Sequence, residues 1–446
     1  MFNKLNPFQQ HLRIGVTGLS HSGKTIFLTS LIHNLLHQKK LPLFSSLQEG
    51  IIEAVTLQHQ PNDSLPRFTY EQHLDNLLSS PPQWPESTKN ISQIRLAIRY
   101  RPQNILARQF GSTQVLTLDI IDYPGEWLLD LPLLETDFFS WSQNAFKSAK
   151  GSIRKKYAQK WLNMVASIDP TQPADERLLS QLAKNYTQYL LDIRKNYNGY
   201  FDLPPGRFLL PGDLKDAPVL TFCPLEIKED VKYPKNSYGY VMQRRFESYK
   251  KLVVKPFFED YFAKLDQQVV LIDPLTTLNH GMDALNDLSH SMETILDILK
   301  PKIHSWLYRL LLGRPMSHIL FAATKADHVH HTQHNNLLKL TQSLIPRAYQ
   351  HSNFTSSHIK IMAIASLRAS SELSHKDGRK LISGRLEDGT EAAIYPGEVP
   401  TSARQALEYE YGFKSLAPPI IKDEQEGFEH IRLDQAIDFL LKDIIR

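Results

Sequence analysis

The sequence predicts an α/β fold with a mostly parallel, doubly wound sheet that is interrupted by a large helical insertion. Short apolar runs alternate with stretches of helical periodicity toward both ends of the 446-residue chain, which is the pattern of strands joined by crossover helices. Residues 130–198 and 241–265 instead have mainly helical character. Because the chain is too long for one ordinary hydrophobic core, the insertion is expected to form a domain of its own.

The elements before the insertion are expected to be a strand, a helix and a hairpin. Residues 12–17 form a short apolar run, and residues 26–37 carry apolar side chains at helical spacing. Residues 61–85, rich in Pro, Ser, Asn and Asp, predict a mostly surface loop around a short helix at 71–78. Residues 93–100 and 114–122 then alternate or run apolar like two neighbouring strands.

The alternation of strand and helix returns after the insertion. Strands are expected at 267–272, 318–324 and 359–365, a helix at 282–312 with a break at Pro301, a β-hairpin at 381–395 turned at Asp388 and Gly389, and a closing amphipathic helix at 433–445. The predicted fold class is therefore α/β, with the helical insertion in the middle and a C-terminal β-hairpin and helix.

Composition excludes several classes of protein. The chain is 41% hydrophobic and 22% charged, as in folded globular proteins. Its 51 basic residues are nearly balanced by 47 acidic ones, so no nucleic-acid partner is expected. The single cysteine, Cys223, fits a reducing compartment. We expect neither a signal peptide nor a transmembrane segment, because no apolar run approaches the roughly 18 to 20 residues needed, and we expect a cytoplasmic location.

A glycine-rich motif lies between the first predicted strand and the first predicted helix. Residues 18–25, GLSHSGKT, match the pattern G-x-x-x-x-G-K-[ST], which chance would produce in roughly one or two of every hundred chains of this length. The glycines let successive backbone N–H groups face one concavity, and the helix adds a partial positive charge. The motif predicts a polyphosphate site, and hence a P-loop protein, at Gly18, Ser20, His21, Ser22, Gly23, Lys24 and Thr25.

Lys24 and Thr25 of this motif have specific expected roles, and a second motif supplies a carboxylate and a backbone amide. Lys24 would reach the β- and γ-phosphates, and the Thr25 hydroxyl would ligate Mg²⁺. The D-x-x-G sequence at residues 122–125 ends a predicted strand. There Asp122 can hold a magnesium-bound water, and the Gly125 amide can sense the γ-phosphate.

A third motif predicts which base is bound. Residues 324–327, TKAD, follow a predicted strand and match [NT]-K-x-D, with Thr324, Lys325 and Asp327 as candidates. The Asp carboxylate can accept hydrogen bonds from two adjacent N–H donors of guanine, a pair that adenine lacks. The alternative is an ordinary aspartate that caps a helix. Ser366 and Leu367 also follow a strand, where a backbone amide can contact the guanine carbonyl, although Ser is equally a common helix N-cap.

The remaining magnesium ligand would come from a threonine on the loop ahead of the second strand. Thr88 is best placed, directly before residues 93–100. Thr69 is an alternative, and so is an ordinary loop threonine without this role.

With these motifs in this order, the chain resembles the Ras-like GTPase superfamily of P-loop NTPases. More narrowly, residues 18–25, the segment DYPGEW at 122–127 and YPGE at 395–398 are similar to the YcjX-like family of bacterial P-loop NTPases. The resemblance covers most of the chain. It implies a cytoplasmic, stress-associated NTPase, located peripherally at the inner face of the membrane, with an envelope or membrane protein as a partner.

One departure from the Ras-like pattern affects the catalytic residues. Glu126, followed by Trp127, stands where such proteins commonly carry a glutamine. Glu126 can orient water or act as a base, but its charge beside the γ-phosphate is costly unless compensated. His21 either lies near the phosphates or faces solvent. The catalytic candidates are therefore Lys24, Glu126 and His21.

The resulting hypothesis is a Mg²⁺-dependent GTP/GDP-binding protein that hydrolyses GTP and acts as a regulatory switch. The G domain would comprise residues 1–128 and 266–446, with 129–265 as the helical insertion and a hairpin insertion at 376–400. One alternative is an ATP-dependent NTPase or kinase, in which the TKAD sequence is structural. Another is a nucleotide-binding scaffold with little turnover. Basic segments at 147–160 and 243–255 can dock an acidic partner or an anionic membrane, or can simply be solvated helix faces.

Overall fold

The structure is a computed structural model, and it divides the chain into two compact units. It describes residues 9–19, 22–60, 62–63, 65–86, 89–103, 113–151, 154–196, 204–215, 217–299, 316–345, 357–374, 378–408 and 411–445. The first unit comprises Met1–Tyr123, Leu265–Ser289 and Arg314–Arg446, and the second comprises Pro124–Lys264 and His290–Gly313. The second unit thus begins five residues before the expected insertion at 129–265, because the segment after Tyr123 packs with the helices that follow it.

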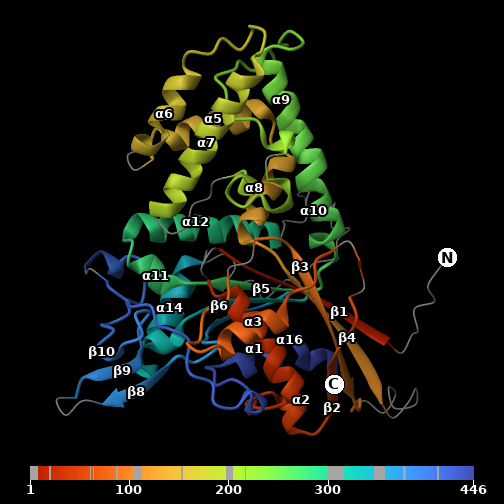
Figure 1. The fold of residues 1–446 in the computed structure, drawn as a ribbon, viewed down its shortest axis with the longest axis vertical. Helices are drawn as coiled ribbons and strands as arrows, with labels where there is room; N and C mark the ends of the chain where they lie inside the picture. Colours follow the sequence, from red (N-terminus) through yellow and green to blue (C-terminus); the bar gives the residue numbers. More distant parts are fainter. Residues whose placement is uncertain are drawn as a thin grey trace. The chain divides into compact units, whose positions relative to one another are not determined.

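The first unit is built on a seven-stranded sheet in the order β2-β3-β4-β1-β5-β6-β7 (Figure 1). The strands are β1 (Gln9–Gly18), β2 (Ile52–Leu57), β3 (Ser92–Tyr100), β4 (Gln114–Asp122), β5 (Gln267–Ile272), β6 (His318–Ala323) and β7 (His358–Ala363). β3 runs antiparallel to both β2 and β4, and the pairs from β4 through β7 are parallel. The predicted mixed α/β fold with a mainly parallel sheet is therefore confirmed.

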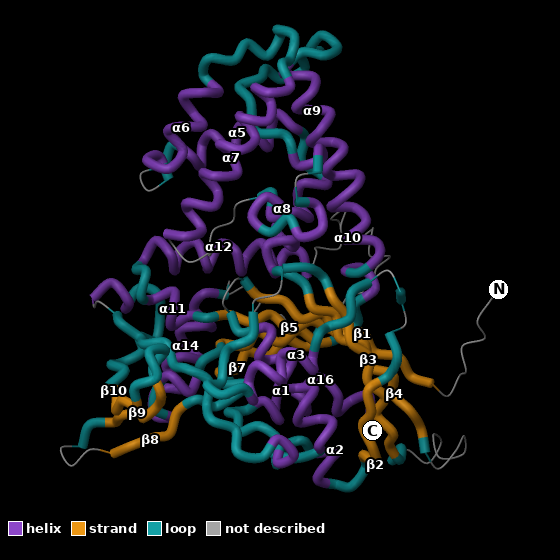
Figure 2. Tube along the Cα trace, viewed as in Figure 1, coloured by secondary structure: helices purple, strands orange, loops and turns teal. Residues whose placement is uncertain are grey.

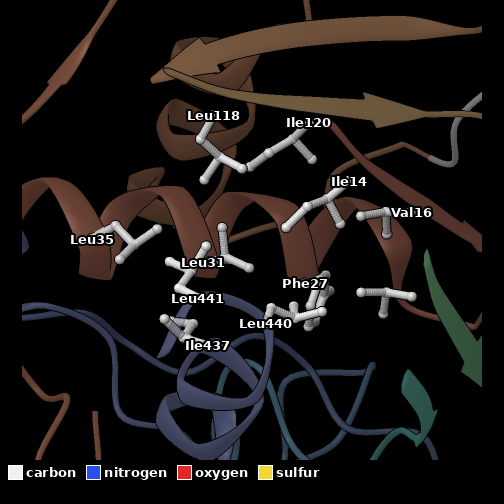
Figure 3. A pocket seen from close by; sticks show the side chains of 11 residues that line it. Ile14, Val16, Phe27, Leu31, Leu35, Leu118, Ile120, Ile437, Leu440 and Leu441 are labelled. Atoms are coloured by element: carbon white, nitrogen blue, oxygen red, sulfur yellow. The ribbon is translucent and has the colours of Figure 1, made fainter. Parts of the chain in front are cut away.

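The central strands of the sheet are buried on both sides. Every residue of β5 and β6 is buried, as is usual for parallel strands that are covered on both faces. On one face, α1 (Lys24–His37) and α16 (Leu433–Ile445) pack against side chains of β1 and β4. A small gap in this core is lined only by apolar groups (Figure 3), so it is a packing gap and not a site for a charged ligand.

Shorter elements complete the first unit. They are α2 (Ser45–Gln48), α3 (Tyr70–Leu78), α11 (Pro274–Leu278), the first part of α12 (Met282–Leu299), and α14 (His334–Leu344), which packs against β6 and β7. A second sheet has the order β10-β9-β8, formed by β8 (Ser370–Ser374), β9 (Lys380–Arg385) and β10 (Glu391–Ile394). β9 and β10 pair antiparallel around a turn at Gly389, whose φ is +86°.

The second unit is helical (Figure 2). It contains the 3₁₀ segment η1 (Gly125–Leu134), α5 (Phe138–Ala149), α6 (Lys155–Val165), α7 (Glu176–Asn196), α8 (Gly206–Leu209), α9 (Tyr238–Tyr249) and α10 (Lys255–Asp260). Its core is a cluster of aromatic rings: Trp141 stacks on Phe246, and Trp161 stacks on Phe146 and Tyr189. Edge and stacked ring pairs of this kind stabilise a core beyond their buried area.

Some expectations fall partly outside the described residues. The helix expected at 282–312 is described as far as Leu299, and the break expected at Pro301 lies beyond that point. In the described part of the chain, no helix has both the length and the apolar character that crossing a bilayer requires.

Candidate functional site

The glycine-rich loop joins the end of β1 to the start of α1. A side chain at position 18 would collide with the Ser22 hydroxyl and would come within 2.8 Å of the Leu271 carbonyl oxygen, so only glycine fits there. Gly23 has a φ of +82°, a left-handed conformation that glycine adopts without strain. The predicted phosphate-binding residues Ser20 and His21 lie outside the described residues.

Both polar side chains at the start of α1 are buried beside this loop. Lys24 is 7% exposed, and its ammonium group donates to the Gly18 carbonyl at 3.3 Å. Thr25 is 6% exposed, and its hydroxyl donates to the Glu86 carbonyl at 3.1 Å. The ammonium and hydroxyl groups therefore lie at the loop and not in bulk solvent.

Asp122 is held next to the loop by the pairing of β4 with β1. It is 1% exposed and lies opposite Val16 in the parallel register, two residues before the loop begins. The next residue, Tyr123, fixes this end of β4, because its N–H donates to the Val16 carbonyl and its hydroxyl donates to Gln268 at 2.6 Å. The structure thus brings Asp122 to the same edge of the sheet as Lys24 and Thr25.

The segment before β3 also reaches this edge. β3 runs antiparallel to β4, and its first residue, Ser92, pairs with Asp122. Thr88 itself lies outside the described residues. Glu86, two residues earlier, accepts the hydrogen bond from Thr25. The alternative, Thr69, lies at the start of α3 with its hydroxyl 3.2 Å from His73 Nε2.

The TKAD motif at residues 324–327 follows β6, and a buried aspartate that the sequence motifs do not include anchors it. The Lys325 ammonium lies 2.5 Å from Asp273 and donates to the Thr276 hydroxyl at 3.1 Å. Asp273 directly follows β5 and is completely buried. Burial alone would raise the pKa of Asp273, but Lys325 and Thr276 outweigh it and hold the pKa below its usual range. The sequence feature that could have pointed to Asp273 is its position directly after an apolar strand, at the edge of the sheet where ligands bind in such folds.

Asp327 is held by residues of the segment after β7. This residue is 4% exposed, and its carboxylate accepts the Ala369 backbone N–H at 2.8 Å. The Ser370 hydroxyl donates to its carbonyl. Ser366 and Leu367 belong to the same segment after β7 and are both buried. The Thr324 hydroxyl donates instead to the Ile272 carbonyl, which ties β6 to the end of β5.

All these groups lie at one edge of the sheet. β4, β1, β5, β6 and β7 are parallel, so their carboxyl ends meet at the same side. Only β5 separates β1 from β6, which puts the two motifs about 10 Å apart at the usual strand spacing. In open α/β sheets, ligands bind at this edge.

Gly125 and Glu126 belong to the helical unit. Glu126 is 2% exposed, and its carboxylate lies 3.3 Å from the Arg194 guanidinium of α7. Gly206 packs so closely on the Glu126 backbone that a side chain at position 206 would collide with the Glu126 carbonyl. The segment after Asp122 is therefore built into the packing of the helices.

A second buried carboxylate anchors the same segment, and sequence reasoning did not find it either. Asp130 accepts hydrogen bonds from the Gly206 N–H at 2.6 Å and from the Tyr249 hydroxyl at 2.5 Å. Burial raises the pKa of Asp130 to about 6, although these hydrogen bonds act in the other direction. The Arg207 guanidinium lies over the Trp127 ring, 3.3 Å from its centre. No motif marks Asp130, because its partners are distant in sequence.

A G-x-x-x-x-G-K-[ST] loop between the first strand and the first helix of a mainly parallel sheet is the arrangement of P-loop proteins. The model of the YcjX-like family, DUF463, matches residues 12–445. The chain therefore belongs to the YcjX-like family.

Two curated relatives match over nearly their whole lengths. A protein of Escherichia coli (strain K12) named Ras-like GTPase YcjX is 38% identical over 464 aligned positions, which cover 100% of this chain and 99% of the relative. A Shewanella oneidensis protein of the same name is 34% identical, covering 97% of this chain and 94% of the relative.

Proposed function

We propose that this protein binds guanine nucleotides with Mg²⁺ and hydrolyses GTP to GDP and phosphate. The observation that carries the proposal is the position of Lys24 and Asp327 at one edge of the sheet, two strands apart. A nucleotide laid along this edge would have its phosphates at β1 and its base at β6. The names of the two relatives, Ras-like GTPase, support the same class of ligand.

The phosphate end has the donors that a polyphosphate needs. Lys24 would exchange its bond to Gly18 for the β- and γ-phosphates. The Ser22 hydroxyl is buried and has no hydrogen-bond partner among the described residues, so a phosphate oxygen can fill that position. Gly18 and Gly23 keep the loop open to an anion, and Ser20 and His21 remain candidates on it.

The oxygen donors at this end fit a magnesium ion. The Thr25 hydroxyl lies at the start of α1 and the Asp122 carboxylate at the end of β4, and Mg²⁺ prefers such hard oxygen ligands. Thr88 would be the further ligand, since Glu86 already reaches Thr25. The chemistry that Mg²⁺ supplies at such a site is neutralisation of charge on the β- and γ-phosphates.

The base end favours guanine over adenine. Asp327 uses one carboxylate oxygen for Ala369, and its other oxygen can accept from the N–H groups of guanine. Lys325, Thr324, Ser366 and Leu367 would position and flank the base. Adenine would leave the buried carboxylate without its donors, a cost of roughly 1–3 kcal/mol.

In the proposed hydrolysis, water attacks the γ-phosphorus and the bond to the β–γ bridging oxygen breaks. Lys24 would stabilise the developing charge. Glu126 and His21 are our candidates for positioning the water. Because Glu126 lies 3.3 Å from Arg194, it would have to leave that contact first, so we expect slow intrinsic turnover.

The path of the chain supports the proposed switch role. The D-x-x-G motif starts in the sheet unit at Asp122, whereas Gly125 belongs to the helical unit. A movement of Gly125 toward or away from a γ-phosphate would act on the helical unit through the chain itself. A cytoplasmic, stress-associated role is what the family resemblance adds to this proposal.

Two measurements test the proposal. Calorimetry of the full chain should give Mg²⁺-dependent binding of GDP at least tenfold tighter than binding of ADP, and equal or tighter ADP binding would overturn the guanine assignment. Phosphate release from GTP should be faster with the wild-type protein than with Lys24→Ala. If both proteins release phosphate at the same rate and GDP still binds, the protein is a nucleotide-binding scaffold with little turnover and not a GTPase.

A further inference from the structure

A group of two histidines and a glutamate lies next to the TKAD motif and takes no part in the proposed nucleotide chemistry. Its members are His330 and His331, which follow β6, and Glu372 on β8. One ligand atom from each residue lies within 4.8 Å of the others. We propose that His330, His331 and Glu372 form a binding site for a divalent transition metal of the zinc type.

The distances suit such an ion. His331 Nδ1 lies 2.6 Å from Glu372 Oε2, and His330 Nε2 lies 3.7 Å from the same oxygen. Donor atoms around tetrahedral zinc are about 3.4 Å apart, since each bond is about 2.1 Å long. The three side chains would therefore need only small adjustments to share one ion.

The donor set and its surroundings also match a metal centre. Two imidazoles and a carboxylate are zinc ligands, and they leave a fourth position for water. The His330 side chain is 4% exposed and that of His331 is 62% exposed, so the group is anchored on one side and open on the other. The Thr332 hydroxyl lies 3.0 Å from His330 Nδ1. The Thr332 backbone N–H also donates to Nδ1, at 3.4 Å. Thr332 therefore occupies Nδ1, and Nε2 is the His330 nitrogen on the side of Glu372. With a metal bound at Nε2, Nδ1 would carry the proton and donate it in a hydrogen bond to the Thr332 hydroxyl.

Two other histidines of this His-rich segment are hydrogen-bonded to backbone carbonyl groups. His328 Nδ1 lies 3.1 Å from the Lys414 carbonyl, and His334 Nε2 lies 2.8 Å from the Ala326 carbonyl. Only the pair at 330 and 331 faces Glu372 within the described part of the chain. This selection argues for a defined site and against a diffuse histidine-rich surface.

The site would connect the two segments that hold Asp327. One segment carries Asp327 and, three residues later, His330; the other carries Ala369 and Ser370, which bond to Asp327, and then Glu372. Beyond Asp327, the His331 N–H already donates to Glu372 at 2.8 Å, and a bound ion would strengthen this link between the two segments. We therefore expect metal binding to tighten GDP binding a few-fold, and GDP to tighten metal binding by the same factor. This coupling rests on the proposed guanine site, whereas metal binding does not.

The test is titration of the full, tag-free chain with Zn²⁺ and Co²⁺ in the absence of nucleotide, by calorimetry and by the visible absorption of Co²⁺. We expect one saturable site, weakened at least about tenfold in His330→Ala and in Glu372→Gln. The matched control is His290→Ala, which removes a surface histidine 3.9 Å from Glu293 and should leave the affinity unchanged. His330→Cys should restore binding and add a thiolate-to-Co²⁺ absorption band, with circular dichroism confirming that each variant is folded.

Three outcomes decide the matter. Equal affinity in the wild type, His330→Ala and Glu372→Gln would overturn the site. Metal binding that is lost in both variants supports the site even if GDP fails to bind, in which case the proposed function falls and the site stands. GDP binding that responds to Zn²⁺ in the wild type but not in His330→Ala would support the coupling, and an identical response in both would remove it.

Discussion

The lysine at the phosphate end of the candidate site and the lysine at its base end have opposite electrostatic surroundings. Lys24 donates to a carbonyl at 3.3 Å, and no carboxylate among the described residues lies within ion-pair distance of it. Lys325 meets the buried Asp273 at 2.5 Å. The charge of Lys24 therefore remains available to an anion, whereas that of Lys325 is neutralised within the protein. The first lysine is suited to binding and the second to holding a loop in place.

Removing the charge of Lys325 should have the largest effect and tests whether this lysine is structural. Lys325→Met should lower the free energy of unfolding by about 3 kcal/mol, because it leaves the Asp273 carboxylate buried without its cation. Chemical denaturation measures this change. The control is the double variant Lys325→Met/Asp273→Asn, which should regain part of the loss. If the double variant is no more stable than the single one, the pair is not the source of the effect.

Removing the charge of Lys24 should affect binding and not stability. Lys24→Ala should weaken GDP and GTP binding by about 100-fold, since charged hydrogen bonds to two phosphates are lost. Its unfolding free energy should stay near that of the wild type, because the ammonium group makes one long bond to a carbonyl. Fluorescent-nucleotide titration and denaturation together check this prediction. Loss of stability with unchanged affinity would reverse the roles of the two lysines.

Asp327→Asn should act on the base alone. We expect GDP binding to weaken by about 30-fold and ADP binding to stay the same, because an amide cannot accept from both guanine N–H groups and keep its bond to Ala369. The matched control is Asp388→Asn, an exposed aspartate in a hairpin turn, which should change neither affinity. An equal loss of GDP and ADP binding would mean that Asp327 supports the fold and does not select the base.

Acid should lower the stability of the protein through a buried histidine on α1. Burial of His33 on α1 lowers its pKa to about 4, from an ordinary value of 6.5. Between these values the unfolded state binds more protons, so stability should fall by roughly 1 kcal/mol for each unit that the pH drops from 6.5 toward 4. Asp273 stays ionised in this range, since its pKa is lowered.

Denaturation at several pH values between 7 and 5 measures this slope. His33→Gln should flatten it, because glutamine has no titratable group, and the exposed control His290→Gln should not. A slope that is the same in all three proteins would assign the acid sensitivity to another group.

The parallel sheet and the position of the glycine-rich loop could be predicted from the sequence. β5 and β6 each contain a continuous apolar run, 269–272 and 319–323, and the loop motif stands between a strand and a helix, so each pattern is local. β2 was missed because Ile52–Leu57 is short, lies at the sheet edge and alternates only weakly between buried and exposed residues.

Contacts between distant residues could not be predicted in the same way. Asp273 and Lys325 are 52 positions apart, and only the parallel register of β5 and β6 brings them together. The pairing of Glu126 with Arg194 likewise depends on how α7 folds back. Ser20, His21 and Thr88 lie outside the described residues, so their roles remain predictions.

The border between the two units falls inside a motif, between Tyr123 and Pro124. A natural insertion placed in a surface turn can be cut out and the ends rejoined, leaving the host domain intact. Here the same excision would remove Gly125 together with the helices. The helical unit is thus not an independent module that recombination could add or delete, and any lineage that loses it must also rebuild the second half of the D-x-x-G motif.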